Sequence, residues 1–337
     1  MQMVYALDEP GKRKLKFLYK QSGIDYRYSV IPDYSLPANQ WEFFHASENL
    51  EPFPGLEQRM QCFRQHAPAL SERAIRQCLG DYPVQNITHL VTVSCTGISA
   101  PGLDLDLVEL LNLPDTIFRT SVNFMGCYAA VHALKLADAF CRADKKANVL
   151  IVCTELSTLH FQRKPTLDNL TSSLLFGDGS AAVLVTGNDE ENGLKIEQFY
   201  SKTVLKGKKD MAWELSSSGF QMTLSGYVAD LIEGDFNELV CDALNTAKID
   251  KEEITQWCIH PGGKKVLEAV HNSLGFTNGQ LQYSYDVLRD YGNMSSATVL
   301  FVLKNIMDAA DRKRPGKIFG AAFGPGLTME TFILSDQ

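Results

Sequence analysis

Three residues far apart in the sequence carry side chains that could perform acyl-transfer chemistry together. Cys127 comes directly before a run of small and apolar residues at helical spacing, so its thiol faces the first unpaired N–H groups of the expected helix. Those groups and the helix dipole favour the thiolate. His260 ends a short apolar strand pattern, and Asn293 precedes a second small-residue helix. We expect them to supply a nucleophile, a cationic partner and a neutral hydrogen-bond donor.

The chemistry that this combination indicates is transfer of an acyl group from a thioester. An imidazolium at His260 would lower the pKa of the Cys127 thiol from its ordinary value of about 8.5. The Asn293 amide and the His260 N–H would stabilise an enolate or oxyanion, each by roughly 3 to 4 kcal/mol. Each residue also has a plainer interpretation, as a core cysteine, a histidine bonded at a strand end and an asparagine that caps a turn or helix. A cysteine protease could use the same three side chains.

The elements that carry these residues occur twice in the same order. The pattern ITHLVTVSCTG begins at Ile87, and ITQWCIHPGG echoes it from Ile254. In each copy a glycine then opens a small-residue helix, and a basic loop, a buried strand, a Gly-rich corner and a last strand follow. This order predicts an internal duplication: two layered α/β halves, residues 1–188 and 189–337, related by a pseudo-twofold axis, with the seam at 189–193. Such a layout offers no exposed groove for a peptide, which argues against a protease.

Composition excludes several other classes of function. The 337 residues carry a formal net charge of -8, which argues against a sequence-independent nucleic-acid binder. The sequence has no apolar run of transmembrane length and does not open on a signal peptide, so we expect a cytoplasmic protein. The eight cysteines form no CxxC pair and the seven histidines show no ligand spacing, so we expect reduced thiols and no metal. Neither a GxGxxG nor a P-loop motif indicates a nucleotide.

Five stretches carry a resemblance to a known family: GCYAA around Cys127, LLFGDGSAA at 174–182, IHPGGKKVL at 259–267, YGNMSSATVLF at 291–301 and FGPGLTMETFIL at 323–334. In this order they resemble the chalcone and stilbene synthases, the type III polyketide synthases. The resemblance implies a thiolase-like fold of two duplicated halves, in agreement with the repeat. It implies an acyltransferase that extends an acyl-CoA starter by decarboxylative Claisen condensation with malonyl-CoA. The product would be a cyclised resorcinol, phloroglucinol or pyrone.

The resemblance also implies roles for individual residues. Cys127 would be the nucleophile and acyl carrier, and His260 and Asn293 would promote malonyl decarboxylation and hold the enolate. Phe176 matches a gatekeeper between the CoA tunnel and the cavity. Other positions match the substrate cavity, namely Met222, His160, Ser295, Gly324, Pro325 and Gly326, or lie near basic residues that contact CoA phosphates, namely Lys20 and Arg27. The family implies a homodimer and no cofactor beyond the CoA thioesters.

Several departures from the family pattern fall where the product is determined. Met222 stands in place of a second gatekeeper phenylalanine, and His160 takes a position that is small or hydroxylic in the plant enzymes. Ala100 stands where those enzymes send a methionine into the partner's cavity. The loops favour a bacterial-type member with a fatty acyl starter. The sequence also begins after the family's opening strand, so we expect that strand to be missing and a sheet edge to be exposed.

Two alternatives remain open at this point. An enzyme of the ketoacyl-acyl-carrier-protein synthase III or HMG-CoA synthase type would share the fold and the Cys, His and Asn residues but would condense only once. The GNMSSAT and GPGLTMETF stretches favour the polyketide synthase instead. A catalytically silent acyl-CoA binding protein would keep the fold without the reaction, although retention of all three polar residues weighs against it.

Overall fold

The computed structural model describes residues 8–47, 49–188, 193–277, 279–310 and 316–336. The strands are β1 (His89–Ser94), β2 (Phe118–Asn123), β3 (Asn148–Leu156), β4 (Asp178–Thr186), β5 (Leu194–Thr203), β6 (Met211–Ser216), β7 (Gly219–Leu224), β8 (Ile254–Ile259), β9 (Lys317–Gly324) and β10 (Thr328–Asp336). The helices are α1 (Glu9–Gln21), α2 (Leu56–Leu79), α3 (Leu103–Leu111), α4 (Ala129–Ala143), α5 (Leu167–Leu175), α6 (Tyr227–Ala247), α7 (Lys264–Leu274), α8 (Gln282–Tyr291) and α9 (Thr298–Ala310). Within these residues, every helix is too short or too polar to cross a membrane.

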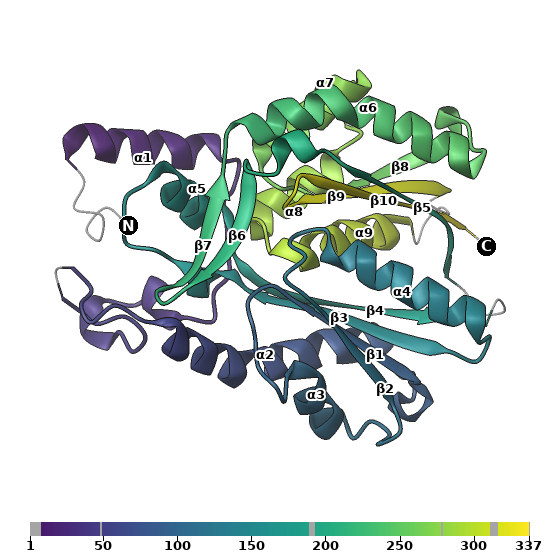
Figure 1. Ribbon diagram of the computed structural model, residues 1–337, viewed down its shortest axis with the longest axis horizontal. Coiled ribbons are helices and arrows are strands. Elements are labelled where there is room, and N and C mark those ends of the chain that lie inside the picture. Colours follow the sequence, from purple (N-terminus) through teal and green to yellow (C-terminus); the bar gives the residue numbers. More distant parts are fainter. Residues whose placement is uncertain (1–7, 48, 189–192, 278, 311–315, 337) are drawn as a thin grey trace.

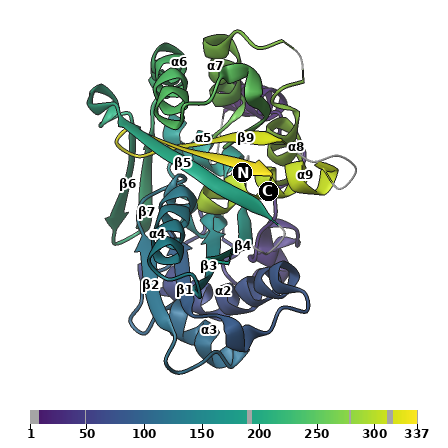
Figure 2. The same cartoon turned by 90° about the vertical axis from the view of Figure 1, so that its right-hand side faces the viewer.

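The elements stack in alternating layers of helix and sheet (Figure 1). One sheet has the strand order β2-β1-β3-β4, and the other has the order β5-β10-β9-β8. Helices α4 and α9 lie between the two sheets, whereas α2 and α3 cover the outside of the first sheet and α6 and α7 the outside of the second. Figure 2 shows the two sheets on either side of the central helices. The predicted layered α/β fold is confirmed.

The strand pairing repeats in the two halves, which confirms the predicted duplication. β1 pairs parallel with β3, and β3 pairs antiparallel with β4. In the second half β8 pairs parallel with β9, and β9 pairs antiparallel with β10. The expected seam lies almost wholly outside the described residues, so the division at 188 and 189 stays a prediction. β10 has a further partner, β5, whereas the corresponding edge of β4 pairs with no strand among the described residues.

Helix α4 of the central layer packs closely because it carries small side chains. Ala129, Ala130, Ala133 and Ala137 of α4 have no exposed surface. Alanine has the highest helix propensity and lets a helix approach a sheet closely, so this run forms a helix that both sheets can cover. The turns that precede α4 and α9 are thereby held at the boundary between the two halves.

Candidate active site

Cys127 lies in the turn between β2 and α4, just before the first turn of the helix, as expected. Gly126 has a φ of +84°, and a Cβ atom there would lie 2.3 Å from Cδ of Pro325. Only glycine therefore fits beside the nucleophile without strain. The backbone N–H of Gly126 also donates to the Sγ atom of Cys95 at 3.1 Å, which fixes the approach of the chain to Cys127.

Asn293 is held so that its amide group faces the thiol. The backbone N–H of Ser295 donates to Oδ1 of Asn293 at 2.8 Å, and the Thr298 hydroxyl donates to the same oxygen at 3.2 Å. These two donors identify Oδ1 as the acceptor. Nδ2 then lies 4.0 Å from Sγ of Cys127 and 3.5 Å from the carbonyl oxygen of Gly262. The amide nitrogen is thus available to a substrate oxygen beside Cys127.

His260 reaches the same cavity from the second half. Its backbone N–H donates to the carbonyl of Ala321 at 2.8 Å, which continues the pairing of β8 with β9, and Gly262 then turns the chain towards α7. The imidazole is 1% exposed, and both ring nitrogens have no hydrogen-bond partner among the described residues. One nitrogen can accept a proton and the other can donate one, since a neutral imidazole carries one N–H. Cys127, His260 and Asn293 therefore line one cavity, as the repeat predicts.

The resting charge state differs from the expected imidazolium and thiolate pair. Burial raises the pKa of the Cys127 thiol to about 12 and lowers the pKa of His260 to about 3. Hydrogen bonds from Ser295 and Asn293 to the sulfur act in the opposite direction but do not outweigh burial. Both groups are accordingly neutral before substrate binds, because removal from water disfavours each charged form. The expected ion pair of an imidazolium with a thiolate is therefore not the state that burial favours.

Glu155 is a buried acidic residue beside this site that the sequence analysis missed. Its carboxylate accepts from the Cys95 N–H at 2.9 Å and from the Ser296 hydroxyl at 2.5 Å, and the side chain has no exposed surface. Burial raises the pKa of Glu155 to about 7, and its negative charge is one cause of the raised pKa of Cys127. The sequence held one signal, a single acidic residue within the otherwise apolar strand NVLIVCTEL.

The cavity around Cys127 has a volume of about 500 Å³ and mostly apolar walls. Phe176, Met222 and Ser295 line it, as the resemblance implies. The residues on either side of Phe176 are bonded to Asn293 through the backbone, since the N–H of Gly177 donates to the carbonyl of Asn293 and the N–H of Asn293 donates to the carbonyl of Leu175, both at 2.9 Å. The position of the expected gatekeeper is therefore set by the same segment that positions Asn293.

The residues of the loop Gly324-Pro325-Gly326 differ in whether they line the cavity. Pro325 lines the cavity, whereas Gly324 and Gly326 do not. A Cβ atom on Gly324 would lie 2.6 Å from Cδ1 of Tyr128 and 3.3 Å from the backbone nitrogen of Cys127. Gly324 therefore lets the loop pack against the turn of the nucleophile instead of forming a wall for substrate.

His160 lies on a second cavity of about 430 Å³ and not on the cavity of Cys127. The two cavities share the lining residues Ser157, Phe176, Trp213 and Met222. These four side chains border both cavities. The His160 ring lies against Trp213 and Phe220, with ring centroids 5.0 and 4.4 Å away, and its part in binding substrate stays a prediction.

The basic residues that line the Cys127 cavity do not include Lys20 or Arg27, whose part in CoA binding stays a prediction. Lys14, Lys264 and Lys265 line the Cys127 cavity, whereas Lys20 is exposed on α1 outside that lining. The Arg27 guanidinium donates to the carbonyl oxygens of Ser173 and Phe176. Arg27 thus fixes the end of α5 next to the gatekeeper. The periodicity of α1 could not decide which of its lysines faces the cavity without knowing where the helix packs.

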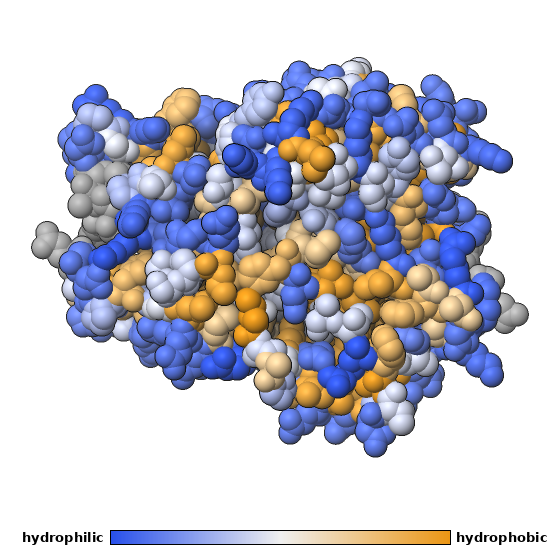
Figure 3. All heavy atoms as spheres, viewed as in Figure 1, coloured by the Kyte–Doolittle hydropathy of each residue, from blue (hydrophilic) through white to orange (hydrophobic). Residues whose placement is uncertain are grey.

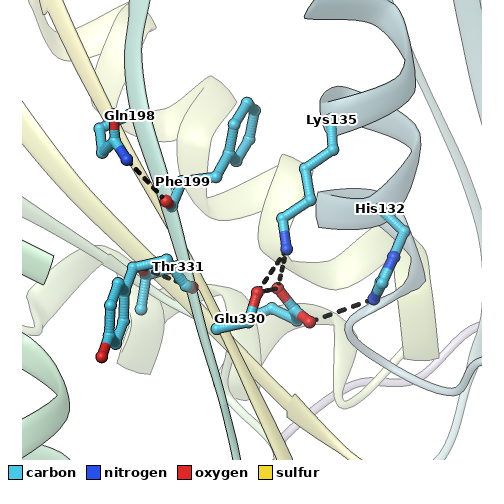
Figure 4. A network of polar contacts seen from close by, with 8 residues as sticks. His132, Lys135, Gln198, Phe199, Glu330 and Thr331 are labelled. Carbon is cyan, nitrogen blue, oxygen red and sulfur yellow. Dashed lines mark hydrogen bonds and ion pairs between the residues drawn. The ribbon is translucent and has the colours of Figure 1, made fainter. Parts of the chain in front are cut away.

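A buried ionic network anchors the helix that follows Cys127 (Figure 4). Glu330 of β10 is 2% exposed, and its carboxylate bonds Nε2 of His132 at 3.1 Å, the Ser201 hydroxyl at 2.7 Å and Nζ of Lys135. His132 and Lys135 both lie on α4, and the other two residues belong to the second half. Burial alone would raise the pKa of Glu330, but the bonds from His132, Lys135 and Ser201 outweigh it and leave that pKa lowered. The network therefore ties the nucleophile's helix to the second half.

Comparisons with known proteins agree with this geometry. Two family models match the chain, "Chalcone and stilbene synthases, N-terminal domain" over residues 6–189 and the corresponding C-terminal domain over residues 196–336. "Probable polyketide synthase 1" of Dictyostelium discoideum is 32% identical over 335 residues, which cover 96% of this chain and 10% of that protein. The chain thus spans about a tenth of the length of that curated relative.

Two solved structures are similar over nearly the whole chain. The crystal structure of PKS-I from the brown alga Ectocarpus siliculosus has a TM-score of 0.91 and 27% identity, and the match covers 98% of this chain and 90% of that one. The C-terminal type III polyketide synthase domain of Steely1, a type I/III hybrid from Dictyostelium, has a TM-score of 0.88 and 30% identity, with 99% and 93% covered.

Proposed function

Because the chain belongs to the chalcone and stilbene synthase family, we propose that it is a type III polyketide synthase that loads an acyl starter from acyl-CoA onto Cys127 and extends it with malonyl-CoA. One observation carries the proposal: a single, mostly apolar cavity is lined by Cys127, His260 and Asn293. Lysines also belong to its lining. The origin of the chain in a bacterial-type branch stays a prediction.

Loading begins with proton transfer from the thiol of Cys127 to the free ring nitrogen of His260. The sulfur attacks the thioester carbonyl of the starter, the bond from that carbonyl to the CoA sulfur breaks, and the CoA thiolate takes the proton from His260 and leaves. The negative charge on the carbonyl oxygen during this step is met by the Asn293 amide N–H. The result is an acyl thioester on Cys127 and a neutral His260.

During extension, Asn293 and His260 both act as hydrogen-bond donors, and the anion that they bind is an enolate. Loss of CO2 from malonyl-CoA leaves its electron pair as a thioester enolate, whose oxygen accepts hydrogen bonds from the amide of Asn293 and the N–H of His260. The enolate carbon attacks the acyl carbonyl on Cys127 and expels the sulfur as a thiolate, and a ketoacyl-CoA forms that is longer by two carbons. The low pKa of His260 supports this role, because a neutral imidazole donates without protonating the enolate.

CoA phosphates would be held by Lys14, Lys264 and Lys265, which belong to the lining of the cavity. Ammonium groups bind phosphate as point charges without a fixed geometry, which suits a flexible diphosphate arm. Lys20 lies on the same helix as Lys14, and its part in CoA binding remains a prediction. The proposed reaction needs no metal or redox cofactor, since each step moves only protons, CO2 and acyl groups.

The test is a product screen by mass spectrometry with malonyl-CoA and acetyl, medium-chain, long-chain and aromatic CoA starters. The Cys127→Ala variant is the blank, and the His66→Phe variant, on α2 outside both cavities, is the matched control. We expect resorcinol, phloroglucinol or pyrone products that contain several malonyl-derived units and are absent from the blank. A product of one condensation would identify the synthase III or HMG-CoA synthase type of enzyme. Bound acyl-CoA without any product would identify a silent binding protein.

We also propose a homodimer, supported by the exposed apolar side chains of one region. Leu105 and Leu110 of α3, Phe118 of β2 and Leu136 of α4 are between 36% and 52% exposed. Figure 3 shows apolar residues gathered over the part of this face where Figure 1 places those elements. β2 is an edge strand whose outer side pairs with no strand among the described residues. A contiguous apolar region beside an open strand edge is typical of a protein–protein interface.

A further inference from the structure

Helix α5 ends where an N–H that would extend it is bonded to another segment. If the helix continued, the N–H of Gly177 would donate to the carbonyl of Ser173, four residues earlier. That N–H donates instead to the carbonyl of Asn293 at 2.9 Å. The carbonyl of Ser173 is therefore available to another donor, at a helix C-terminus that favours cations. The last turn of α5 holds no basic residue of its own.

Arg27, in the segment after α1, supplies that donor. Its Nη1 atom donates to the carbonyl of Ser173 and to the carbonyl of Phe176, the latter at 3.1 Å. Two glycines leave room for its side chain: a Cβ atom on Gly292 would lie 2.8 Å from Cγ of Arg27, and one on Gly177 would lie 3.4 Å from Cβ of Arg27. The side chain of Arg27 therefore lies between the end of α5 and the segment that follows α8.

One N–H thus has two possible acceptors, and Arg27 decides between them. While Arg27 bonds the carbonyl of Ser173, the N–H of Gly177 is left to bond the carbonyl of Asn293. Without the guanidinium, the carbonyl of Ser173 would be unpaired and would compete for that N–H, because an unmade backbone hydrogen bond is costly. The helix would then lengthen by one residue. Asn293 would keep only its other bond to this segment, from its own N–H to the carbonyl of Leu175.

We propose that Arg27 is a positioning residue for the condensation: by bonding the carbonyl of Ser173, it holds Asn293 and Phe176 in place beside Cys127. This inference rests on the proposed function and deepens it. The guanidinium acts through backbone groups and not on the substrate, so this role differs from the expected contact with CoA phosphates. Displacement of an orienting group by about 1 Å can slow a reaction about 100-fold. Loss of Arg27 should accordingly lower kcat and leave KM nearly unchanged.

The experiment measures decarboxylation of malonyl-CoA without a starter, the step in which Asn293 bonds the enolate. The bond to the carboxylate carbon breaks, CO2 leaves, and the enolate takes a proton from water to give acetyl-CoA, which mass spectrometry quantifies. We expect kcat of Arg27→Met to be roughly 10- to 100-fold below that of wild type, with KM for malonyl-CoA little changed. Arg73→Met, the same substitution on an exposed residue of α2 outside both cavities, should match wild type.

Two further variants separate this role from binding of CoA phosphates. Lys265→Met removes a lysine of the cavity lining and should raise KM while kcat is kept. Arg27→Lys keeps the positive charge, but its nitrogen ends one bond short of Nη1, so kcat should stay below that of wild type. A raised KM in Arg27→Met that Arg27→Lys restores would overturn the inference in favour of phosphate binding. If Arg27→Met does not fold, Arg27→Lys carries the comparison with wild type.

A double variant tests whether Arg27 acts through Asn293. Because the two residues would work as a unit, Arg27→Met combined with Asn293→Ala should be no slower than Asn293→Ala alone. Losses that multiply would overturn the inference, since they would indicate general damage to the fold. A readout without turnover is hydrogen exchange: peptides that contain the N–H groups of Gly177 and Asn293 should exchange faster in Arg27→Met and at the wild-type rate in Arg73→Met. Unchanged exchange in Arg27→Met would also overturn it.

The inference and the proposed function fail in distinguishable ways. Wild-type decarboxylation that Arg27→Met retains in full would overturn the inference alone. A wild-type protein that binds malonyl-CoA but releases no CO2 would refute the proposed extension, and the role of Arg27 in that step would fall with it.

Discussion

Replacement of Glu155 by glutamine should stabilise the protein at neutral and alkaline pH and make Cys127 more reactive. Burial raises the pKa of Glu155 from 4.5 to about 7. A carboxyl group whose pKa is raised in the folded state stabilises the fold at low pH. That stabilisation is lost as pH rises from the pKa of the unfolded state through the pKa of the folded state. At about 1.4 kcal/mol per pH unit, the ionised carboxylate costs the fold ~3 kcal/mol above about pH 7.

The amide of glutamine can take over the local contacts of the carboxylate. Its oxygen would accept from the Cys95 N–H, and its nitrogen would donate to the Ser296 hydroxyl, which can rotate to accept. The free energy of unfolding, measured by urea denaturation, should therefore rise for Glu155→Gln relative to wild type. The gain should be ~2 kcal/mol larger at about pH 8 than at about pH 5, because the wild-type carboxyl is protonated at the lower pH.

The same substitution has a second, independent readout at the nucleophile. The negative charge of Glu155 contributes to the raised pKa of Cys127, so its removal should lower that pKa. Alkylation of Cys127 by iodoacetamide at about pH 8 should then be faster in Glu155→Gln than in wild type. A variant that is equally stabilised at both pH values, or destabilised at the higher one, would refute the assigned charge state of Glu155.

Three further predictions test other parts of the structure. Glu330→Gln should change the free energy of unfolding with pH in the opposite direction to Glu155→Gln. The lowered pKa of Glu330 stabilises the fold above the pKa of the unfolded state, and that stability is lost as pH falls. The unfolding free energy of the variant should therefore be about 1 to 3 kcal/mol below that of wild type near pH 7 and equal to it in acid. Gly126→Ala should cost about 1 to 3 kcal/mol and slow acylation of Cys127 in intact-mass assays, since its Cβ would meet Pro325; unchanged acylation would contradict the tight turn. Phe118→Glu should give a monomer by light scattering, with a dimer in wild type; a dimeric variant would place the interface elsewhere.

The meeting of Cys127, His260 and Asn293 at one cavity could be predicted from the sequence because the repeat carries geometric information. Cys127 and Asn293 precede corresponding helices, and a duplicated fold brings corresponding helix starts to the boundary between its halves. His260 directly follows β8, the strand that its apolar pattern predicted. Local periodicity predicts where each helix and strand lies in the sequence, and the duplication predicts which of their ends lie close together. The three positions could therefore be predicted without knowledge of side-chain packing.

Properties that depend on long-range packing could not be predicted in the same way. Glu155 becomes part of the site only because Cys95 and Ser296, from other elements, supply its donors. Arg27 was expected at CoA because it is basic, but its direction depends on where α5 ends. His160 was expected on the substrate cavity by resemblance alone, and the structure places it on a second cavity whose shared border with the Cys127 cavity comes from β6, β7, the end of α5 and the segment after β3. No pattern within one element encodes such a border.

The neutral resting state of Cys127 has a consequence for how the reaction is controlled. The thiol has a pKa of about 12 and its acceptor His260 one of about 3, so proton transfer between them in the empty cavity is strongly unfavourable. A thioester carbonyl placed beside Asn293 changes this balance, because the charge passes from sulfur to an oxygen that the amide can bond. Under the proposed function, acylation would be coupled to substrate binding, and the thiol would be protected from adventitious electrophiles while the cavity is empty. Substitutions that admit water to the cavity should therefore increase the rate at which iodoacetamide labels Cys127 and decrease the rate of condensation. An increase in both rates would contradict this coupling.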